Sequence, residues 1–427
     1  MLFLVLAALA TFRCQTDAAP TLTPGDEAVM QRCAALLNGT TDEFGNNESQ
    51  NSISDNPCEW TNTLYLNVMC SNTRTPNTAR VTEITWTSAA GDLSDLGLEE
   101  LDALQSLTIT SAAEQIGGGG PTNVTLTLSP AWATGLTSLQ SFDYGPGTLK
   151  AFDSIFMKGG FPALTDLTIS NTYVLGNYPA GSLPKAVDGA FPALTELSIN
   201  NCSITEFPAT WGSSTGMFGG LQSLVLNYNN MSGSLPVWTS SAASDYWANL
   251  NSLDLSYNQF KGSLPSSWAE PGSFGTLLTL ILDNNTDITG TLPSNWASGL
   301  FRLSSSNQLT LEQAADAFLI GLENTTSDYA VISSIGSFTA NQGGNAGTTA
   351  TLVGYSFQGL GLSGSIPASW SNQSVANAVA ALRLNPNEEQ KANSPQYPHL
   401  SINAQGTNLC GSLPANAQPV NEGLNNN

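Results

Sequence analysis

The sequence predicts an α/β solenoid, in which short repeats stack into a curved parallel β-sheet with an irregular or helical convex side. The clearest sign is a near-copy, because the segment that begins at Phe161 recurs thirty residues later at Phe191 with few changes. A second sign is the pattern L-x-x-L-x-L-x-x-N, which returns at intervals of mostly 25 to 30 residues. A chain of 427 residues is too long for one ordinary core, and stacked repeats explain how it buries its 41% of apolar residues.

Each copy of the pattern predicts one rung of the sheet. Its L-x-L segment forms a short strand, and neighbouring repeats pair these strands in parallel with the leucines turned into the core. This leucine-rich repeat starts at Leu104, Leu139, Leu164, Leu194, Leu221, Leu250, Leu277, Leu352 and Val379. The ninth position is expected to carry a buried amide that bonds main-chain groups of the turn, and it holds Asn229, Asn258, Asn285 and Asn387. Cys202 takes this position in one repeat, where we expect a small, unpaired thiol.

A second motif, G-x-L/I-P, follows the strand motif. It begins at Gly181, Gly233, Gly262, Gly290, Gly364 and Gly411. Glycine permits the bend and proline fixes the extended return, and the motif resembles that of plant-type extracellular leucine-rich-repeat proteins over most of residues 104–414. Trp268, Trp296 and Trp370 extend it to L/I-P-x-x-W, which is similar to protist and algal surface leucine-rich-repeat proteins. Because these tryptophans follow the repeat, we expect them in the core.

Residues 20–80 are expected to form an N-terminal cap that shields the first repeat. Helical periodicity runs from Asp26 to Leu37, and the segments P-C-E-W at 57–60 and V-M-C at 68–70 resemble the cap of plant-type repeat proteins. The resemblance implies a disulfide between Cys58 and Cys70, which would staple a region with little core of its own. Cys33 could pair with Cys14 if a signal peptide is cut after Ala10, and the sequence leaves the pairings of Cys33 and Cys410 open.

The rest of the chain divides by composition. Residues 81–299 carry the repeats, 351–414 carry terminal repeats, and 415–427 form a polar tail. The pattern falters over 300–350, where a helical stretch precedes a run rich in Gly, Asn and Thr. This segment is either an island of the kind that helps to build ligand pockets in some receptor families, or a set of degenerate repeats with long convex loops.

Several features favour a secreted or cell-surface glycoprotein. Residues 1–19 are expected to form a signal peptide, since a short apolar run precedes the small-x-small triplet that ends at Ala10. No later stretch is apolar enough to span a membrane. Sequons of the form N-x-S/T predict glycosylation at Asn38, Asn47, Asn123, Asn201, Asn230, Asn284, Asn324 and Asn372.

Charge and motif content argue against several functions. With 33 acidic and 11 basic residues the net charge is −22, which disfavours nucleic acid and anionic lipid as partners. The single histidine, His399, has no nucleophile context, and no metal-ligand or phosphate-binding motif is present. We therefore expect no enzyme activity, no metal and no cofactor.

The expected function is recognition through the concave face of the sheet. Tyr228 and Tyr257 occupy the same position of consecutive repeats and should stand side by side, bordered by Asn227, Asp254 and Asp283. Such a patch suits a protein or carbohydrate partner. The alternatives are a self-associating structural subunit of an extracellular coat, matrix or filament, and an inhibitor of a secreted wall-degrading enzyme.

Overall fold

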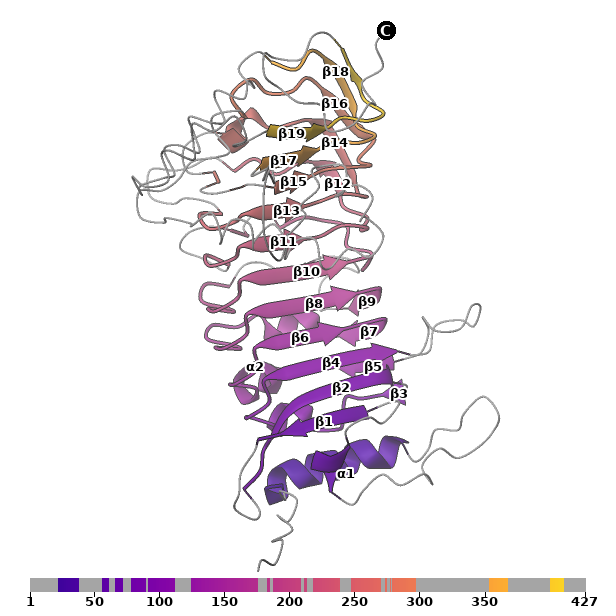
Figure 1. Cartoon of the computed structure of the whole chain (residues 1–427), viewed down its shortest axis with the longest axis vertical. Coiled ribbons are helices and arrows are strands. Elements are labelled where there is room, and N and C mark those ends of the chain that lie inside the picture. Colours follow the sequence, from indigo (N-terminus) through magenta and orange to yellow (C-terminus); the bar gives the residue numbers. More distant parts are fainter. Residues whose placement is uncertain are drawn as a thin grey trace, which may run out of the picture.

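The computed structural model describes the chain in sixteen stretches. They are residues 22–37, 56–60, 66–71, 78–89, 91–111, 124–175, 183–184, 187–208, 211–212, 218–238, 247–269, 273–274, 277, 279–296, 353–367 and 400–410. Together they form one elongated stack of parallel rungs with a helix across its N-terminal end (Figure 1). The leucine-rich-repeat solenoid that the sequence predicts is therefore confirmed.

The described residues contribute eleven strands to the main sheet. In spatial order these are β1 (Leu66–Cys70), β2 (Val81–Ala89), β4 (Ser106–Ser111), β6 (Ser141–Tyr144), β8 (Asp166–Ser170), β10 (Glu196–Asn200), β11 (Ser223–Val225), β13 (Ser252–Asp254), β15 (Thr279–Ile281), β17 (Val353–Ser356) and β19 (Leu400–Asn403). All neighbours are parallel except β1, which lies antiparallel to β2. The near-copies pair in register, with Leu167 beside Leu197 and Ile169 beside Ile199.

Two smaller parallel sheets run along another side of the stack, where the sequence predicts irregular or helical structure. One contains β3 (Gly91–Asp92), β5 (Val124–Thr127), β7 (Gly147–Lys150) and β9 (Thr172–Leu175). The other contains β12 (Ser232–Ser234), β14 (Gln259–Ser263), β16 (Asp287–Gly290), β18 (Gly361–Gly364) and β20 (Asn408–Leu409). The glycine of the G-x-L/I-P motif has a positive φ in this second sheet, as at Gly233 (φ 89°) and Gly262 (φ 88°). Helical segments are short: α2 (Pro130–Gly135) and the 3-10 turns η2 (Pro57–Glu59), η3 (Leu98–Glu100), η5 (Phe152–Ile155) and η6 (Ser266–Ala269).

The L-P-x-x-W motif has a structural role between repeats. Trp211, Trp268 and Trp296 are fully buried, as expected. The indole N–H of each donates to the carbonyl of the motif proline one repeat earlier: Trp211 to Pro184 (2.9 Å), Trp268 to Pro236 (2.8 Å) and Trp296 to Pro265 (3.0 Å). Each tryptophan ring thus fills the core and links two repeats.

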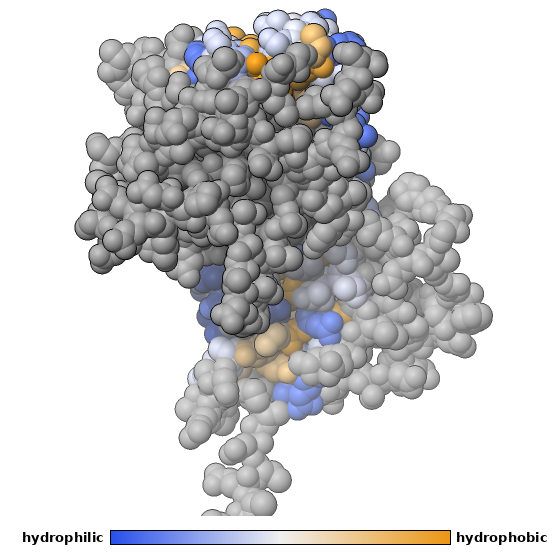
Figure 2. Space-filling view, turned by 45° about the horizontal axis from the view of Figure 1, so that its top comes forward, coloured by the Kyte–Doolittle hydropathy of each residue, from blue (hydrophilic) through white to orange (hydrophobic). Residues whose placement is uncertain are grey.

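In Figure 2, which brings the C-terminal end of the stack forward, apolar residues are visible at that end among hydrophilic ones.

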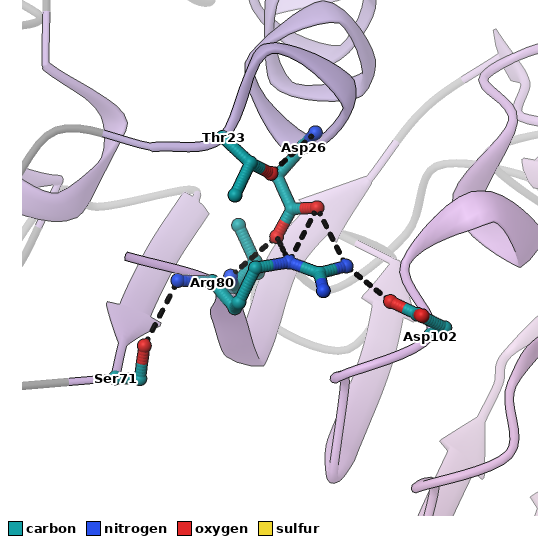
Figure 3. Close-up of polar contacts among 6 residues, drawn as sticks. Thr23, Asp26, Ser71, Arg80 and Asp102 are labelled. Carbon is teal, nitrogen blue, oxygen red and sulfur yellow. Dashed lines mark hydrogen bonds and ion pairs between the residues drawn. The ribbon is translucent and has the colours of Figure 1, made fainter. Parts of the chain in front are cut away.

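The N-terminal cap is anchored by a buried carboxylate. Helix α1 (Pro24–Leu37) carries Asp26, which accepts hydrogen bonds from the Val81 N–H (2.7 Å) and from Nε of Arg80 (3.1 Å) (Figure 3). Arg80 also pairs with Asp102, so the helix, strand β2 and the first turn of the repeats share one ionic cluster. The expected Cys58–Cys70 disulfide is present and joins η2 to β1.

Three details differ from the sequence analysis. The first rung is β2, whose V-x-x-I-x-W pattern from Val81 fits the repeat template, one repeat before the first predicted start at Leu104. Strand β17 pairs directly with β19, so the rung after β17 is Leu400–Asn403. The sequence predicts the next repeat at Val379 instead. Residues 368–399 lie outside the described part. Cys33 is a free, buried thiol, which contradicts its pairing with Cys14.

Candidate binding surface at the edge of the main sheet

A row of side chains marks the turn by which each repeat leaves the main sheet. It occupies the eighth position of the repeat, directly before the ninth-position asparagine or its substitute. We call it the position-eight row, and it consists of Asn171, Asn201, Tyr228, Tyr257 and Asn284. Backbone φ is positive at all five residues, between 50° and 57°. Asparagine tolerates this left-handed conformation, whereas tyrosine adopts it at a cost on the order of 1 kcal/mol.

Main-chain hydrogen bonds to the following repeat hold the row in place. The N–H of Asn201 donates to the Asn227 carbonyl (3.1 Å), that of Tyr228 to Ser256 (3.1 Å) and that of Tyr257 to Asp283 (2.7 Å). The row is therefore fixed by the stack and not by its own side chains. Four aromatic residues of the core, Phe161, Phe191, Phe218 and Trp247, also have positive φ, so this conformation alone does not mark a binding site.

The two tyrosines form the aromatic centre of the row. Their rings stack with centroids 4.1 Å apart and an angle of 9° between their planes, as the repeat spacing predicts. Tyr228 is 36% exposed, and Tyr257 is half-buried. The facing sides of the two rings therefore cover each other.

Asn227, Asp254 and Asp283 lie beside the tyrosines but are not accessible. They are 3%, 4% and 2% exposed, so they support the turn from inside. Asn227 donates to Oδ2 of Asp254 (3.0 Å), and Oδ1 of Asp254 accepts from the N–H (2.9 Å) and hydroxyl (2.6 Å) of Ser256. Oδ1 of Asp283 accepts from the Gln358 N–H (2.7 Å). Sequence alternation placed these groups on the sheet face, and their burial depends on neighbours that alternation does not specify.

The expected asparagine ladder lies directly beneath the tyrosines. Asn229 donates to the carbonyls of Ile199 (2.7 Å) and Leu226 (3.1 Å) and accepts from the Cys202 N–H (2.9 Å). Asn258 and Asn285 repeat this arrangement one and two rungs further on. Cys202 is unpaired, as expected, and burial raises the pKa of its thiol to about 12, which keeps it protonated. Asn387 lies outside the described residues.

Three sequons flank the tyrosines. Asn201 and Asn284 are the neighbours of the pair within the row, and Asn230 lies two residues beyond Tyr228. Asn201 and Asn230 are exposed and Asn284 is half-buried. Two of these asparagines form hydrogen bonds with other side chains: Asn201 donates to Asn171 (2.6 Å), and Asn230 accepts from Gln259 (2.9 Å). The other sequons, Asn38, Asn47, Asn123, Asn324 and Asn372, lie outside the described part of the chain.

One half-buried carboxylate on the sheet face was not singled out by sequence. Asp143 lies in β6, between Thr108 of β4 and Thr168 of β8 in the pairing register. Burial raises the pKa of its carboxyl from 3.8 to about 6. The sequence pattern places an acid at this strand position but carries no signal of its desolvation.

The described stretches hold neither a metal-binding group of side chains nor a helix that could cross a membrane. Within them no group of three or more His, Cys, Asp or Glu side chains could hold a metal ion. No helix there is long and apolar enough to cross a membrane. His399 lies outside these stretches. The surface therefore offers hydrogen-bonding and aromatic groups for binding.

The register and the asparagine ladder define a leucine-rich-repeat solenoid, and comparisons with known proteins agree with this class. The family model described as Leucine Rich Repeat matches residues 249–270, which span β13, the Asn258 turn and β14. No curated protein matches the sequence.

Several solved structures are similar to this chain at low sequence identity. A TDR receptor is 14% identical over 79% of this chain and 46% of its own, with a TM-score of 0.41. The ectodomain of the Arabidopsis receptor kinase HAESA, in complex with an IDA peptide hormone, is 17% identical over 92% of this chain and 47% of its own, with a TM-score of 0.40. A plant ice-binding protein is 16% identical over 93% of this chain and 90% of its own, with a TM-score of 0.31. The chain spans about half the length of the two receptors, and the fold assignment rests on its own register.

Proposed function

We propose that this chain is a non-catalytic, secreted or cell-surface glycoprotein that binds a protein or carbohydrate partner at the edge of its main sheet. The observation that carries the proposal is the stacked pair Tyr228–Tyr257, which reaches the surface from a rigid turn. Tyrosine supplies a large contact area at little entropic cost, and here the backbone and the partner ring already fix both side chains.

The surroundings of the pair favour an uncharged partner surface. The neighbours of the pair in the position-eight row are Asn201 and Asn284. Gln259 lies two residues beyond Tyr257, at the tenth position of the same repeat. Amide and phenol groups bond to hydroxyl or peptide groups without requiring a charge, which fits a sugar or an extended peptide. This is a neutral surface in a chain whose net charge is −22.

A binding screen with matched variants tests the proposal. Protein secreted from eukaryotic cells is applied to a glycan array and to a displayed library of random linear peptides, and the dissociation constant of the best hit is measured. Tyr228→Ala/Tyr257→Ala should weaken that hit at least tenfold, whereas Lys261→Ala on β14 should change it less than twofold. Equal affinity of all three proteins would contradict the proposal.

The same preparation tests the glycosylation and assembly on which the proposal depends. Mass mapping after enzymatic deglycosylation should find modified Asn201, Asn230 and Asn284. Light scattering should find monomers if the protein is a binder. Ordered polymers without a hit on either array would favour the structural-subunit alternative, and inhibition of a secreted wall-degrading hydrolase would favour the inhibitor alternative.

A further inference from the structure

We propose that Tyr228 and Tyr257 are also a site of oxidative cross-linking, at which a one-electron phenol oxidant, such as a peroxidase with hydrogen peroxide, joins the two rings covalently. The proposal is independent of any binding partner. It rests on the distance, orientation, fixation and exposure of the two phenols.

The geometry brings the two phenol rings into contact. Their centroids lie 4.1 Å apart and their planes are 9° from parallel, so the two rings face each other at close range. Coupling of two phenols needs such an encounter, and holding reactants in place removes most of its entropic cost. The pair belongs to consecutive repeats, so the link would form within one molecule.

The backbone keeps the rings in this arrangement. Both tyrosines have φ of 53°, and their N–H groups donate to Ser256 and Asp283 of the following repeats. The next residue in each turn is a buried ladder asparagine, Asn229 or Asn258. The backbone positions from which both rings project are therefore fixed by the stack.

Exposure decides which phenols of the described part can react. Tyr228 is 36% exposed and can lose an electron to an oxidant at the surface. Tyr144 is a contrast, because it is fully buried and its hydroxyl donates to the Thr148 carbonyl (2.9 Å). The thiol nearest in the repeat lattice, Cys202, is buried and protonated, so it is a poor competitor for the radical.

The chemistry balances with hydrogen peroxide as the oxidant. Each phenol loses one electron and its hydroxyl proton to give a phenoxyl radical. The two radicals form a carbon–carbon bond at the ring positions next to oxygen, and the hydrogens on these carbons shift to the oxygens to restore both phenols. Hydrogen peroxide takes up the two electrons and two protons and leaves as two water molecules.

The test uses the purified full-length chain at high dilution, with a peroxidase and a limited amount of hydrogen peroxide. Mass spectrometry of a digest should find the peptides that contain Tyr228 and Tyr257 joined, with a mass lower by two hydrogens. Dityrosine fluorescence should appear, and its yield per molecule should not depend on protein concentration. Conversion of added free tyrosine to dityrosine in a parallel sample reports that the one-electron oxidant was active.

Conservative variants provide the control. Tyr228→Phe and Tyr257→Phe keep a stacked ring and should melt as the parent does, yet each should abolish the joined peptide. The cross-linked parent should melt at a higher temperature, because the bond closes a loop of one repeat in the unfolded chain. Joined chains without the internal link, no link under conditions that couple free tyrosine, or an unchanged link in either Phe variant would overturn the proposal. None of these results bears on the ligand screen, which requires no oxidant.

Discussion

At the scale of single residues, buried asparagines that occur once in each of three consecutive repeats stabilise the turns. Asn229, Asn258 and Asn285 each donate to carbonyls of their own repeat and of the preceding one, and accept from a main-chain N–H. These side chains stabilise the fold because they give hydrogen-bond partners to main-chain groups of the turn. A buried main-chain group without a partner costs about 1–3 kcal/mol.

Asn258→Ala should lower the free energy of unfolding by about 2–4 kcal/mol, because it leaves the carbonyls of Leu226, Leu255 and Ser256 and the Met231 N–H without this partner. Chemical denaturation followed by tryptophan fluorescence measures the change. Gln222→Ala, at an exposed position of the preceding repeat, is the control and should cost less than about 0.5 kcal/mol. Similar losses in both variants would show that the ladder is not what stabilises the turn.

The raised pKa of Asp143 predicts how the free energy of unfolding changes with pH. Its pKa is raised by burial to about 6, so the protonated form is favoured in the folded state. Its contribution to stability is fully present below the unfolded pKa, near pH 4, and is lost as pH rises through about 6. Asp143→Asn should therefore stabilise the protein by about 1–3 kcal/mol at pH 7 and leave it unchanged at pH 4. Denaturation curves at the two pH values decide this, and an equal shift at both would contradict the assignment.

At the scale of elements, the cap shows how a helix is attached to a repeat stack. Asp26 of α1 is 2% exposed and serves both the guanidinium of Arg80 and the first N–H of β2. Asp102 joins the same guanidinium from an exposed position. The two carboxylates share a partner but differ in burial, which gives a matched comparison.

Asp26→Ala should destabilise the cap by about 3 kcal/mol, because it leaves Arg80 and the Val81 N–H without their buried partner. Asp102→Ala should cost less than about 1 kcal/mol, as is usual for an exposed pair. Hydrogen exchange of the α1 and β2 amides locates the effect. Equal protection of these amides in both variants would be the contrary result.

Prediction from the sequence succeeded for elements with a strict period. The rungs from Leu164 to Asn285, the ladder at Asn229, Asn258 and Asn285, the buried Trp268 and Trp296 and the Cys58–Cys70 disulfide follow from spacing or from the motifs of the cap. The smaller sheets were missed because their strands have two to five residues with few apolar positions, too short for a recognisable alternation. The rung at Leu400 was missed because its pattern lacks a leucine at the first position.

At the scale of the whole molecule, stacking makes each repeat depend on its neighbours, and charge opposes the compact state. The chain carries 33 acidic and 11 basic residues, and three ion pairs among its described residues, Arg32–Glu100, Arg80–Asp26 and Arg80–Asp102, lie where the cap meets the first repeat. Repulsion among the remaining acids is therefore spread along the stack.

Raising the ionic strength from about 0.01 to 0.15 M should raise the melting temperature by roughly 1–3 °C, because the screening length falls from about 30 to 8 Å. Calorimetry in sodium chloride measures the shift. Sucrose at equal osmolality separates charge screening from preferential exclusion. A fall in melting temperature with salt would mean that attractive pairs outweigh the net repulsion.

The sequence by itself determined the solenoid, its rungs and the adjacency of Tyr228 and Tyr257, because a strict repeat fixes which positions of consecutive turns become neighbours. Tertiary structure decided which members of the expected patch reach the surface. Tyr228 is exposed, whereas Asn227, Asp254 and Asp283 are buried, since burial depends on what packs over a strand and not on the strand's own alternation. It also decided that the carbonyls of Pro184, Pro236 and Pro265 accept the indole N–H of the tryptophan in the next repeat, a contact that no spacing within one repeat reveals.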